Sequence, residues 1–327
     1  MSTNSRKLKY CLAINEALHQ MMEADPTVFI IGQGVKSPWY VGNTATGLLE
    51  KFGEERVIDT PVSENAVTGA AVGSSLVGMR PVVVHPRMDF MMYAMDPIIN
   101  EAANWHYMFG GKASAPVVVW GIINRGGEQA AQHSQALHAV FSHIPGLKVV
   151  MPSTPYDAKG LMVSAIRDDN PVVYIDDRWL HDDEGNVPED LYDVPIGKAE
   201  IRRTGRDITL VSVSYLVPHA IAAAKELAED GIDCEVIDLR TVKPLDRECL
   251  LNSVFKTGRL AVADVGWKAF GIAAEIGAII FESGFDHLKG PLVRIGLPDA
   301  PAPASGPLEK AYYPDRTRIK DAIQKVF

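Results

Sequence analysis

Short apolar runs alternate with longer segments of helical periodicity along the first half of the chain. Each run is almost continuously apolar, which is typical of parallel strands covered on both faces. The segments between the runs repeat their apolar positions at helical spacing. The pattern predicts strands at 28–31, 81–85, 115–122, 147–151 and 171–175, and helices at 10–23, 46–52, 65–77, 91–108 and 156–167.

A polar stretch at 181–193, rich in Asp, Glu, Gly and Asn, interrupts this alternation. Such composition is typical of an interdomain linker, although a long surface loop within one domain is the alternative. A fresh series of strands and helices follows, at 208–213, 218–229, 234–239, 246–255, 260–264, 270–281 and 292–295. Right-handed crossovers would give two α/β domains with open, mostly parallel sheets, which we place at 1–187 and 188–327.

Composition narrows the class of protein. The 327 residues are 47% hydrophobic and 22% charged, enough for two packed cores. The 32 basic and 41 acidic residues give a net charge of -9, which argues against a nucleic-acid-binding surface. Apolar stretches such as 115–123 are far too short to span a membrane, and the polar segment 1–10 lacks a signal-peptide core.

Three widely spaced cysteines, Cys11, Cys234 and Cys249, complete this picture. They offer neither a disulfide framework nor a cysteine-based zinc site, which is typical of proteins from a reducing compartment. We therefore expect a cytoplasmic protein.

The first candidate for chemistry is Glu64, in the segment 59–65, directly before a helix rich in small residues. Ser63 is a candidate N-cap, and an acid in the first turn of a helix complements the helix dipole. The flanking segments are apolar, however, so a buried carboxylate that handles protons is the alternative interpretation.

Two further candidates are His133 and Phe90. His133 lies in the loop 129–135, beyond the end of a predicted parallel strand, where α/β sheets bind ligands, and imidazole titrates near neutrality. Phe90 lies in the segment 87–93, whose Met and aromatic residues are typical of core packing; a flat face for a heteroaromatic ring is the alternative.

Several common signatures are missing from the sequence. It contains no Gly-x-Gly-x-x-Gly fingerprint, no phosphate-binding Gly-x-x-x-x-Gly-Lys loop, no His-Glu-x-x-His zinc motif and no Gly-x-Ser-x-Gly elbow. A nucleotide enzyme or a hydrolase acting alone is therefore poorly supported.

Segments spread over the whole chain resemble the beta subunit of thiamine-diphosphate-dependent 2-oxoacid dehydrogenases of the pyruvate, branched-chain and acetoin types. The similar segments, in the same order, are 59–64, 132–135, 145–150, 165–168, 235–241 and 256–259. The resemblance implies an N-terminal pyrimidine-binding domain and a C-terminal transketolase-type domain. It also implies an oxidoreductase that is active only with an alpha subunit.

The same resemblance assigns roles to the three candidates. Glu64 matches the glutamate that hydrogen-bonds N1′ of the cofactor's aminopyrimidine and so favours the imino tautomer that takes the thiazolium C2 proton. Phe90 matches the aromatic residue stacked on the pyrimidine. His133 matches a histidine near the thiazolium that handles protons or positions the acyl group during transfer.

The resemblance also implies a bound potassium ion, because relatives bind potassium in this subunit largely through backbone carbonyls. Oxygen-only coordination suits a hard cation. The alternative for this region is an ordinary helix end and turn at 166–171. The ligands implied by the resemblance are Val117, Ala165, Ile166, Asp168 and Asn170.

The diphosphate end of the site is missing from this chain. The family's magnesium and diphosphate motif begins with Gly-Asp-Gly and belongs to the alpha subunit, and no Gly-Asp-Gly occurs here. The resemblance thus implies thiamine diphosphate bound between chains, with magnesium held by the alpha subunit, in an assembly of two alpha and two beta chains. The acyl acceptor would be a lipoyl-bearing acyltransferase.

Two alternatives remain open at this point. The first is a two-chain transketolase-like or acyloin-forming enzyme that uses the same cofactor without a lipoyl partner. The second is a noncatalytic scaffold chain of such an assembly, which the presence of Glu64 disfavours.

Some segments depart from the family pattern. Many relatives have Gly-Glu-Asp-Val at 32–35, where this chain has Gly-Gln-Gly-Val; the segment 36–43 is unusual; and Asp264-Val265 replaces a frequent Asp-Glu. Arg87 stands where relatives are commonly apolar. We expect Arg87 to face the substrate channel and to favour an anionic or hydroxylated substrate.

Overall fold

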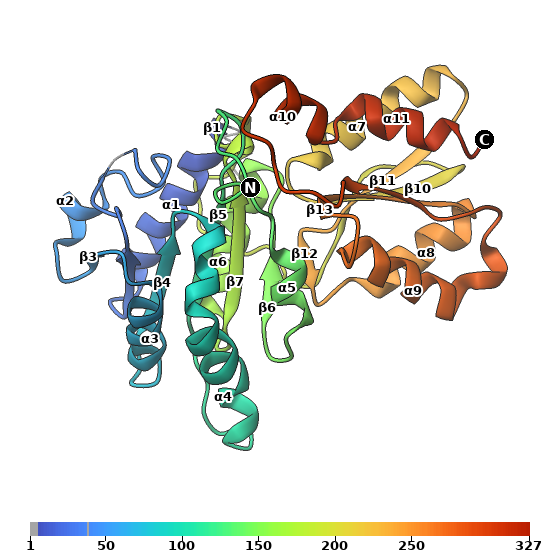
Figure 1. The fold of residues 1–327 in the computed structure, drawn as a ribbon. Helices are drawn as coiled ribbons and strands as arrows, with labels where there is room; N and C mark the ends of the chain where they lie inside the picture. The colour runs from blue at the N-terminus through green and yellow to red at the C-terminus, as the bar shows by residue number, and fades with distance from the viewer. Residues whose placement is uncertain (1–5, 38) are drawn as a thin grey trace. The chain divides into compact units, whose positions relative to one another are not determined.

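The computed structural model describes residues 6–37 and 39–327, which pack as two units (Figure 1). The first comprises 6–125 and 132–196, and the second comprises 126–131 and 197–327. Each unit is built on one mostly parallel sheet with helices packed against it, so the predicted fold class is confirmed.

The sheet of the first unit is parallel throughout. Its strands are β2 (Val28–Gly32), β3 (Val57–Asp59), β4 (Arg80–His85), β5 (Val118–Ile123), β6 (Lys148–Val150) and β7 (Val172–Asp177), in the spatial order β6-β7-β5-β4-β2-β3. The predicted strands are confirmed, and β2, β5 and β7 are buried along their whole length, as strands covered on both faces must be. The sequence analysis missed β3, whose three residues are too short to give a periodic signal.

The helices of this unit are α1 (Tyr10–Ala24), α2 (Leu48–Phe52), α3 (Glu64–Ser75), α4 (Ala103–Met108), α5 (His138–His143) and α6 (Pro155–Arg167), with a 3-10 turn η3 at Arg178–Leu180. Helix α6 is capped at its start: Thr154 Oγ1 accepts a hydrogen bond from Asp157 N at 3.1 Å, and Pro155 occupies the first turn. Helices α1 and α6 pack against each other.

The prediction of a single helix at 91–108 is wrong. The chain forms a 3-10 segment η1 (Met88–Ala94), a π-helical segment η2 (Asp96–Ala102) and then α4. Pro97 lies at the start of η2 and has no N–H to donate to the preceding turn, so regular α-helical hydrogen bonding is interrupted where the winding changes.

The polar stretch after residue 181 is ordered on the first unit. Strand β8 (Glu184–Val187) pairs antiparallel with β1 (Arg6–Lys9), and Val194 N donates a hydrogen bond to Gly160 O. The two units divide between Ile196 and Gly197, whereas the sequence analysis placed the domain boundary between 187 and 188.

The side chain of Lys159 holds the segment 188–190 on the first unit. Its side chain is fully buried, and Nζ lies 2.5 Å from a carboxylate oxygen of Glu16. The same ammonium donates to three consecutive backbone carbonyls at 2.8–3.1 Å, those of Pro188, Glu189 and Asp190. Burial lowers the pKa of Lys159, and the hydrogen bond and the charge of the paired Glu16 oppose that shift.

The second unit has the strand order β14-β13-β10-β11-β9, in which only β9 is antiparallel to its neighbour. The strands of this sheet are β9 (Glu200–Arg203), β10 (Ile208–Ser212), β11 (Cys234–Asp238), β13 (Leu260–Trp267) and β14 (Val293–Leu297), and the unit also contains β12 (Thr241–Lys243) outside it. Its helices are α7 (Leu216–Glu229), α8 (Arg247–Thr257), α9 (Ile272–Gly284), η4 (Phe285–His287), α10 (Gly306–Tyr312) and α11 (Arg316–Gln324). Within residues 6–37 and 39–327, none of the helices combines the length and apolar character needed to cross a bilayer.

We predict that Lys159→Met lowers the free energy of unfolding by about 3–5 kcal/mol, because it removes the buried ammonium that joins Glu16 to the carbonyls of 188–190. Urea denaturation followed by circular dichroism measures this loss. Lys51→Met is the matched control, since Lys51 pairs with Glu23 at the surface and should leave the urea midpoint nearly unchanged. Equal midpoints for the two variants would contradict the role of Lys159.

Candidate active site

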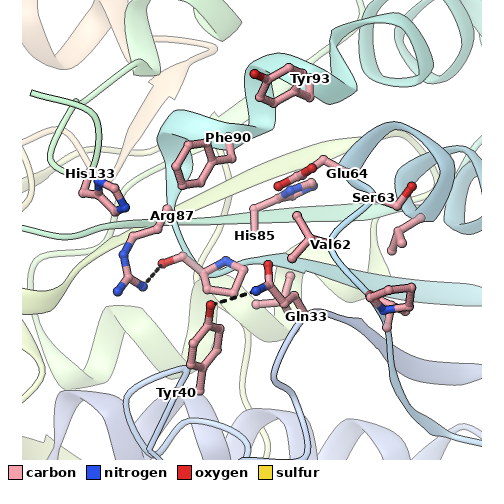
Figure 2. A pocket seen from close by; sticks show the side chains of 15 residues that line it. Gln33, Tyr40, Val62, Ser63, Glu64, His85, Arg87, Phe90, Tyr93 and His133 are labelled. Atoms are coloured by element: carbon pink, nitrogen blue, oxygen red, sulfur yellow. Dashed lines mark hydrogen bonds between the residues drawn. The ribbon is translucent and has the colours of Figure 1, made fainter.

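A cavity of about 490 Å³ opens in the first unit at the carboxyl edge of its sheet (Figure 2). Gln33 follows the end of β2, Thr60 follows β3, and Pro86 follows β4. The loops after three neighbouring parallel strands therefore all line the cavity. This edge is where open parallel sheets bind ligands. The remaining lining residues are Tyr40, Pro61, Val62, Ser63, Glu64, Val67, Val84, His85, Arg87, Phe90, Tyr93 and His133.

Glu64 is the first residue of α3 and lines this cavity. Its side chain is half-buried, and within residues 6–37 and 39–327 its carboxylate has no hydrogen-bond or ion-pair partner. The expected capping hydrogen bond from Ser63 does not form. The Glu64 carboxylate is therefore free to accept a hydrogen bond from a ligand.

Phe90 and His133 line the same cavity from different elements. Phe90 belongs to η1, and His133 lies in the loop after β5. Their ring centroids are 5.3 Å apart with an interplanar angle of 89°, an edge-to-face contact. The structure thus brings together Glu64, Phe90 and His133, and Figure 2 shows Phe90 between the other two in this view.

Asp89 fixes the loop that carries His133. Its Oδ1 accepts hydrogen bonds from Gln135 N at 3.2 Å and from Gln135 Nε2 at 2.9 Å. Burial raises the pKa of the Asp89 carboxyl, and the Gln135 hydrogen bonds oppose that shift by stabilising the carboxylate. Sequence reasoning did not assign Asp89 a role, because its partner lies far along the chain.

His85 forms part of the cavity wall at the end of β4. It is almost completely buried, and its Nε2 lies 3.1 Å from Thr68 Oγ1 on α3. Burial lowers the pKa of His85 to about 4, so the imidazole is neutral near pH 7. The contact ties β4 to the helix that begins with Glu64, and the sequence analysis did not identify it.

Gln33, Tyr40 and Arg87, which belong to segments that depart from the family pattern, line one cavity, whereas Asp264-Val265 lies in β13 of the second unit. Gln33 Nε2 donates a hydrogen bond to Tyr40 Oη at 2.9 Å, and the Arg87 guanidinium carbon is 6.0 Å from the centroid of the Tyr40 ring. Gly34 has φ +73°, and a Cβ there would lie 2.0 Å from the Tyr40 ring, so glycine is required for this approach. Pro38 of the unusual 36–43 segment lies outside the described residues.

The residues expected to hold potassium lie elsewhere in the unit, around the end of α6. The carbonyls of Ile166 and Asp168 both accept hydrogen bonds from Arg80 Nη1, at 3.0 and 3.1 Å. Val117 O accepts a hydrogen bond from Val172 N at 3.0 Å, and Asn170 N donates to Asp168 Oδ1 at 2.9 Å. In the described part of the chain, the imidazole, thiolate and carboxylate groups form no cluster of three or more that could hold a metal ion.

Comparison with known proteins adds two family matches. Residues 6–180 match the family model for the transketolase pyrimidine-binding domain, and residues 197–319 match the model for the transketolase C-terminal domain. A solved structure described as a split gene transketolase, an inactive beta4 tetramer, has a TM-score of 0.79 at 23% identity over 97% of this chain and 98% of the other, which supports the fold.

Curated relatives are similar over nearly their whole length. The chain is 44% identical to the acetoin:2,6-dichlorophenolindophenol oxidoreductase subunit beta of Cupriavidus necator, over 98% of both chains. It is 43% identical to the pyruvate dehydrogenase E1 component subunit beta of Rickettsia felis, over 96% of both chains. It is 40% identical to the 2-oxoisovalerate dehydrogenase subunit beta of Bacillus subtilis, over 98% of both chains.

We predict that His85 makes stability depend on pH. Its pKa is about 4 when folded and about 6.5 when unfolded, so the unfolded chain binds more protons between these values. The contribution of neutral His85 to the free energy of unfolding is complete above pH 6.5 and is lost as the pH falls toward 4. The free energy of unfolding therefore falls by about 2 kcal/mol between pH 7 and pH 5.

Urea denaturation of the wild type and of His85→Gln at the two pH values tests this prediction. Glutamine retains a polar group near Thr68 but does not titrate, so the variant should lose about 2 kcal/mol less between pH 7 and pH 5. An equal fall in the free energy of unfolding between pH 7 and pH 5 in both proteins would contradict the role of His85.

Proposed function

Because this chain belongs to the transketolase-type family that includes the beta subunits of 2-oxoacid dehydrogenases, we propose that it is the beta subunit of a thiamine-diphosphate-dependent 2-oxoacid dehydrogenase. The enzyme decarboxylates a 2-oxoacid and transfers the acyl group to a lipoyl carrier. The observation that carries the proposal is the unpartnered carboxylate of Glu64, which shares one cavity with Phe90 and His133.

The residues present fit the pyrimidine end of the cofactor. A carboxylate without a protein partner and the face of a phenyl ring line a cavity of about 490 Å³, as recognition of an aminopyrimidine requires. The sequence contains no Gly-Asp-Gly motif for magnesium and diphosphate. When bound, thiamine diphosphate supplies a nucleophilic thiazolium carbon that adds to the 2-oxo group and accepts the electron pair released by decarboxylation.

Each of the three residues has a defined task in this proposal. Glu64 shares a proton with N1′ and so favours the tautomer that deprotonates C2. Phe90 holds the pyrimidine plane by stacking. His133 handles protons near the reacting carbon, and its edge-to-face contact with Phe90 sets the orientation of its ring.

An alpha subunit completes the active site. It supplies the magnesium and diphosphate ligands that this sequence lacks, in an assembly of two alpha and two beta chains. The names of the curated relatives as beta subunits support this partnership, and those of pyruvate and 2-oxoisovalerate dehydrogenases support a lipoyl-bearing acyltransferase as acceptor. The proposed domains, 1–187 for pyrimidine binding and 188–327 of the transketolase C-terminal type, agree in order with the family matches.

Potassium is proposed as a structural ion at Val117, Ala165, Ile166, Asp168 and Asn170. The carbonyls of Ile166 and Asp168 converge on one cationic nitrogen, Arg80 Nη1, and a carbonyl oxygen has a second lone pair to offer an ion. Backbone oxygens without thiolate or imidazole suit a hard monovalent cation.

We predict that replacing sodium by potassium at constant ionic strength raises the thermal midpoint of the chain by about 2–4 °C, because an ion that binds only the folded state stabilises it. Calorimetric scans in the two chloride salts measure the difference. Identical midpoints would overturn the potassium site.

We predict that Glu64→Gln leaves assembly with the alpha subunit intact but slows exchange of the C2 proton by about 100- to 10,000-fold, because an amide cannot share the N1′ proton. Hydrogen–deuterium exchange at C2, followed by NMR in the reconstituted complex, measures this step. The wild-type complex should also reduce a lipoyl carrier with a 2-oxoacid, whereas the variant should not.

Glu248→Gln is the matched control, since Glu248 is an exposed glutamate in the first turn of α8. It should exchange C2 at the wild-type rate. Wild-type exchange by Glu64→Gln would refute its role, whereas C2 exchange without lipoyl reduction would favour the acyloin-forming or transketolase-like alternative.

A further inference from the structure

Two arginines flank Tyr40 without any carboxylate partner. Within residues 6–37 and 39–327, neither Arg87 nor Arg178 forms an ion pair, and the buried Nε of each has no hydrogen-bond acceptor. Desolvated charges in proteins are normally paired, because an uncompensated buried charge is costly. The wall at Tyr40 therefore carries positive charge that no ion pair in the described part of the chain neutralises, although the charge of Asp176 acts on Arg178 and opposes the lowering of its pKa.

The acidic groups nearest to Arg178 in sequence are engaged elsewhere. Asp176 lies 2.6 Å from His181 Nε2 and accepts a hydrogen bond from Trp120 Nε1 at 2.9 Å. Asp177 lies 3.3 Å from Arg125 Nε. The carboxylate that does line the cavity is Glu64, and Figure 2 shows it to the right of the view, whereas Arg87 lies at the left.

Arg87 lines the cavity, whereas Arg178 is not among the lining residues and instead holds the Tyr40 segment in place. Arg87 Nη1 donates to Pro86 O at 2.9 Å, and its other guanidinium N–H groups have no acceptor in the described part of the chain. Arg178 Nη2 donates to the backbone carbonyl of Tyr40, which fixes the segment that carries the Tyr40 ring. The proximity of Arg87, after the larger effect of burial, lowers the pKa of Arg178, as expected for two like charges.

The anchored Tyr40 also holds Gln33. Tyr40 Oη accepts a hydrogen bond from Gln33 Nε2 at 2.9 Å, so its own O–H remains available to a second acceptor. The wall thus presents a phenol, an amide and a guanidinium to the cavity, next to His133. An oxyanion satisfies these donors better than an alkyl group does, because a guanidinium binds a carboxylate or phosphate through two parallel hydrogen bonds.

We propose that Arg87, with Tyr40 and Gln33, binds an anionic group of the substrate, a carboxylate or a phosphate, at the end remote from the reacting 2-oxo group. Arg178 acts as a positioning residue that holds Tyr40 and adds positive charge. The assignment rests on the proposed function, because it places the substrate beside His133 in the cofactor cavity. The substrate class is then a 2-oxoacid with a second negative charge.

The test uses the complex reconstituted with the alpha subunit and four substrates. Pyruvate and 2-oxoisovalerate have uncharged side chains, 2-oxoglutarate has a distal carboxylate, and phosphohydroxypyruvate has a distal phosphate. We predict that kcat/KM for one of the two doubly charged substrates exceeds that for pyruvate by at least about tenfold, since hydrogen bonds between charged groups are about twice as strong as those between neutral groups. The preferred member of that pair identifies the anion.

Arg87→Gln should reduce kcat/KM for the preferred doubly charged substrate about 10- to 100-fold more than for pyruvate. Arg87→Lys should restore part of the difference, because it returns the charge without the planar fork. Arg167→Gln is the matched control, since Arg167 pairs with Asp193 at the surface. Calorimetric binding of glutarate and inorganic phosphate to wild-type and Arg87→Gln complexes gives a readout that does not depend on turnover.

Preference for the uncharged side chains, equal loss for all substrates in Arg87→Gln, or absence of binding of both anions would each overturn the subsite. Failure of the proposed function is a separate result, seen as the absence of C2 proton exchange in the wild-type complex. A complex that exchanges C2 and prefers pyruvate would retain the proposed function and refute the role of Arg87.

Discussion

Parallel pairing of β2, β3 and β4 is the constraint from which the candidate site follows. Because these strands run in one direction, their carboxyl ends lie at one edge, and the loops that leave them meet there. Buried β-branched residues along β4 allow helices to cover both faces of the sheet, so this edge is one of the few places where polar side chains can gather. Glu64, Arg87 and Phe90 reach one cavity for that reason.

Hydrogen bonds between buried polar groups fix the relative positions of the elements that line the cavity. The contact between His85 and Thr68 joins β4 to α3, and Asp89 joins η1 to the loop of His133 through Gln135. In both cases a buried polar group is matched by a partner on another element, which limits the positions the lining residues can adopt. The neutral state of His85 adds no charge next to the Glu64 carboxylate.

The sequence predicted those features that depend on local pattern. Long apolar runs identified the strands, and apolar positions at helical spacing identified the helix at 156–167, which is α6. The resemblance singled out Glu64, Phe90 and His133, for which composition alone left alternatives open. The contacts of Lys159, Asp89 and Arg178 join residues far apart in the chain, and no periodicity or motif reports such pairs.

The anchoring of Asp89 to Gln135 divides the cavity into a wall whose parts are joined to each other and a wall that is held separately. Phe90 and His133 belong to elements joined by these hydrogen bonds, so a substitution that displaces one ring displaces the other. Gln33 and Tyr40 lie on a separate loop, outside this pair of anchors. A substitution at Gln33 or Tyr40 can therefore reshape the second wall without moving the rings of Phe90 and His133.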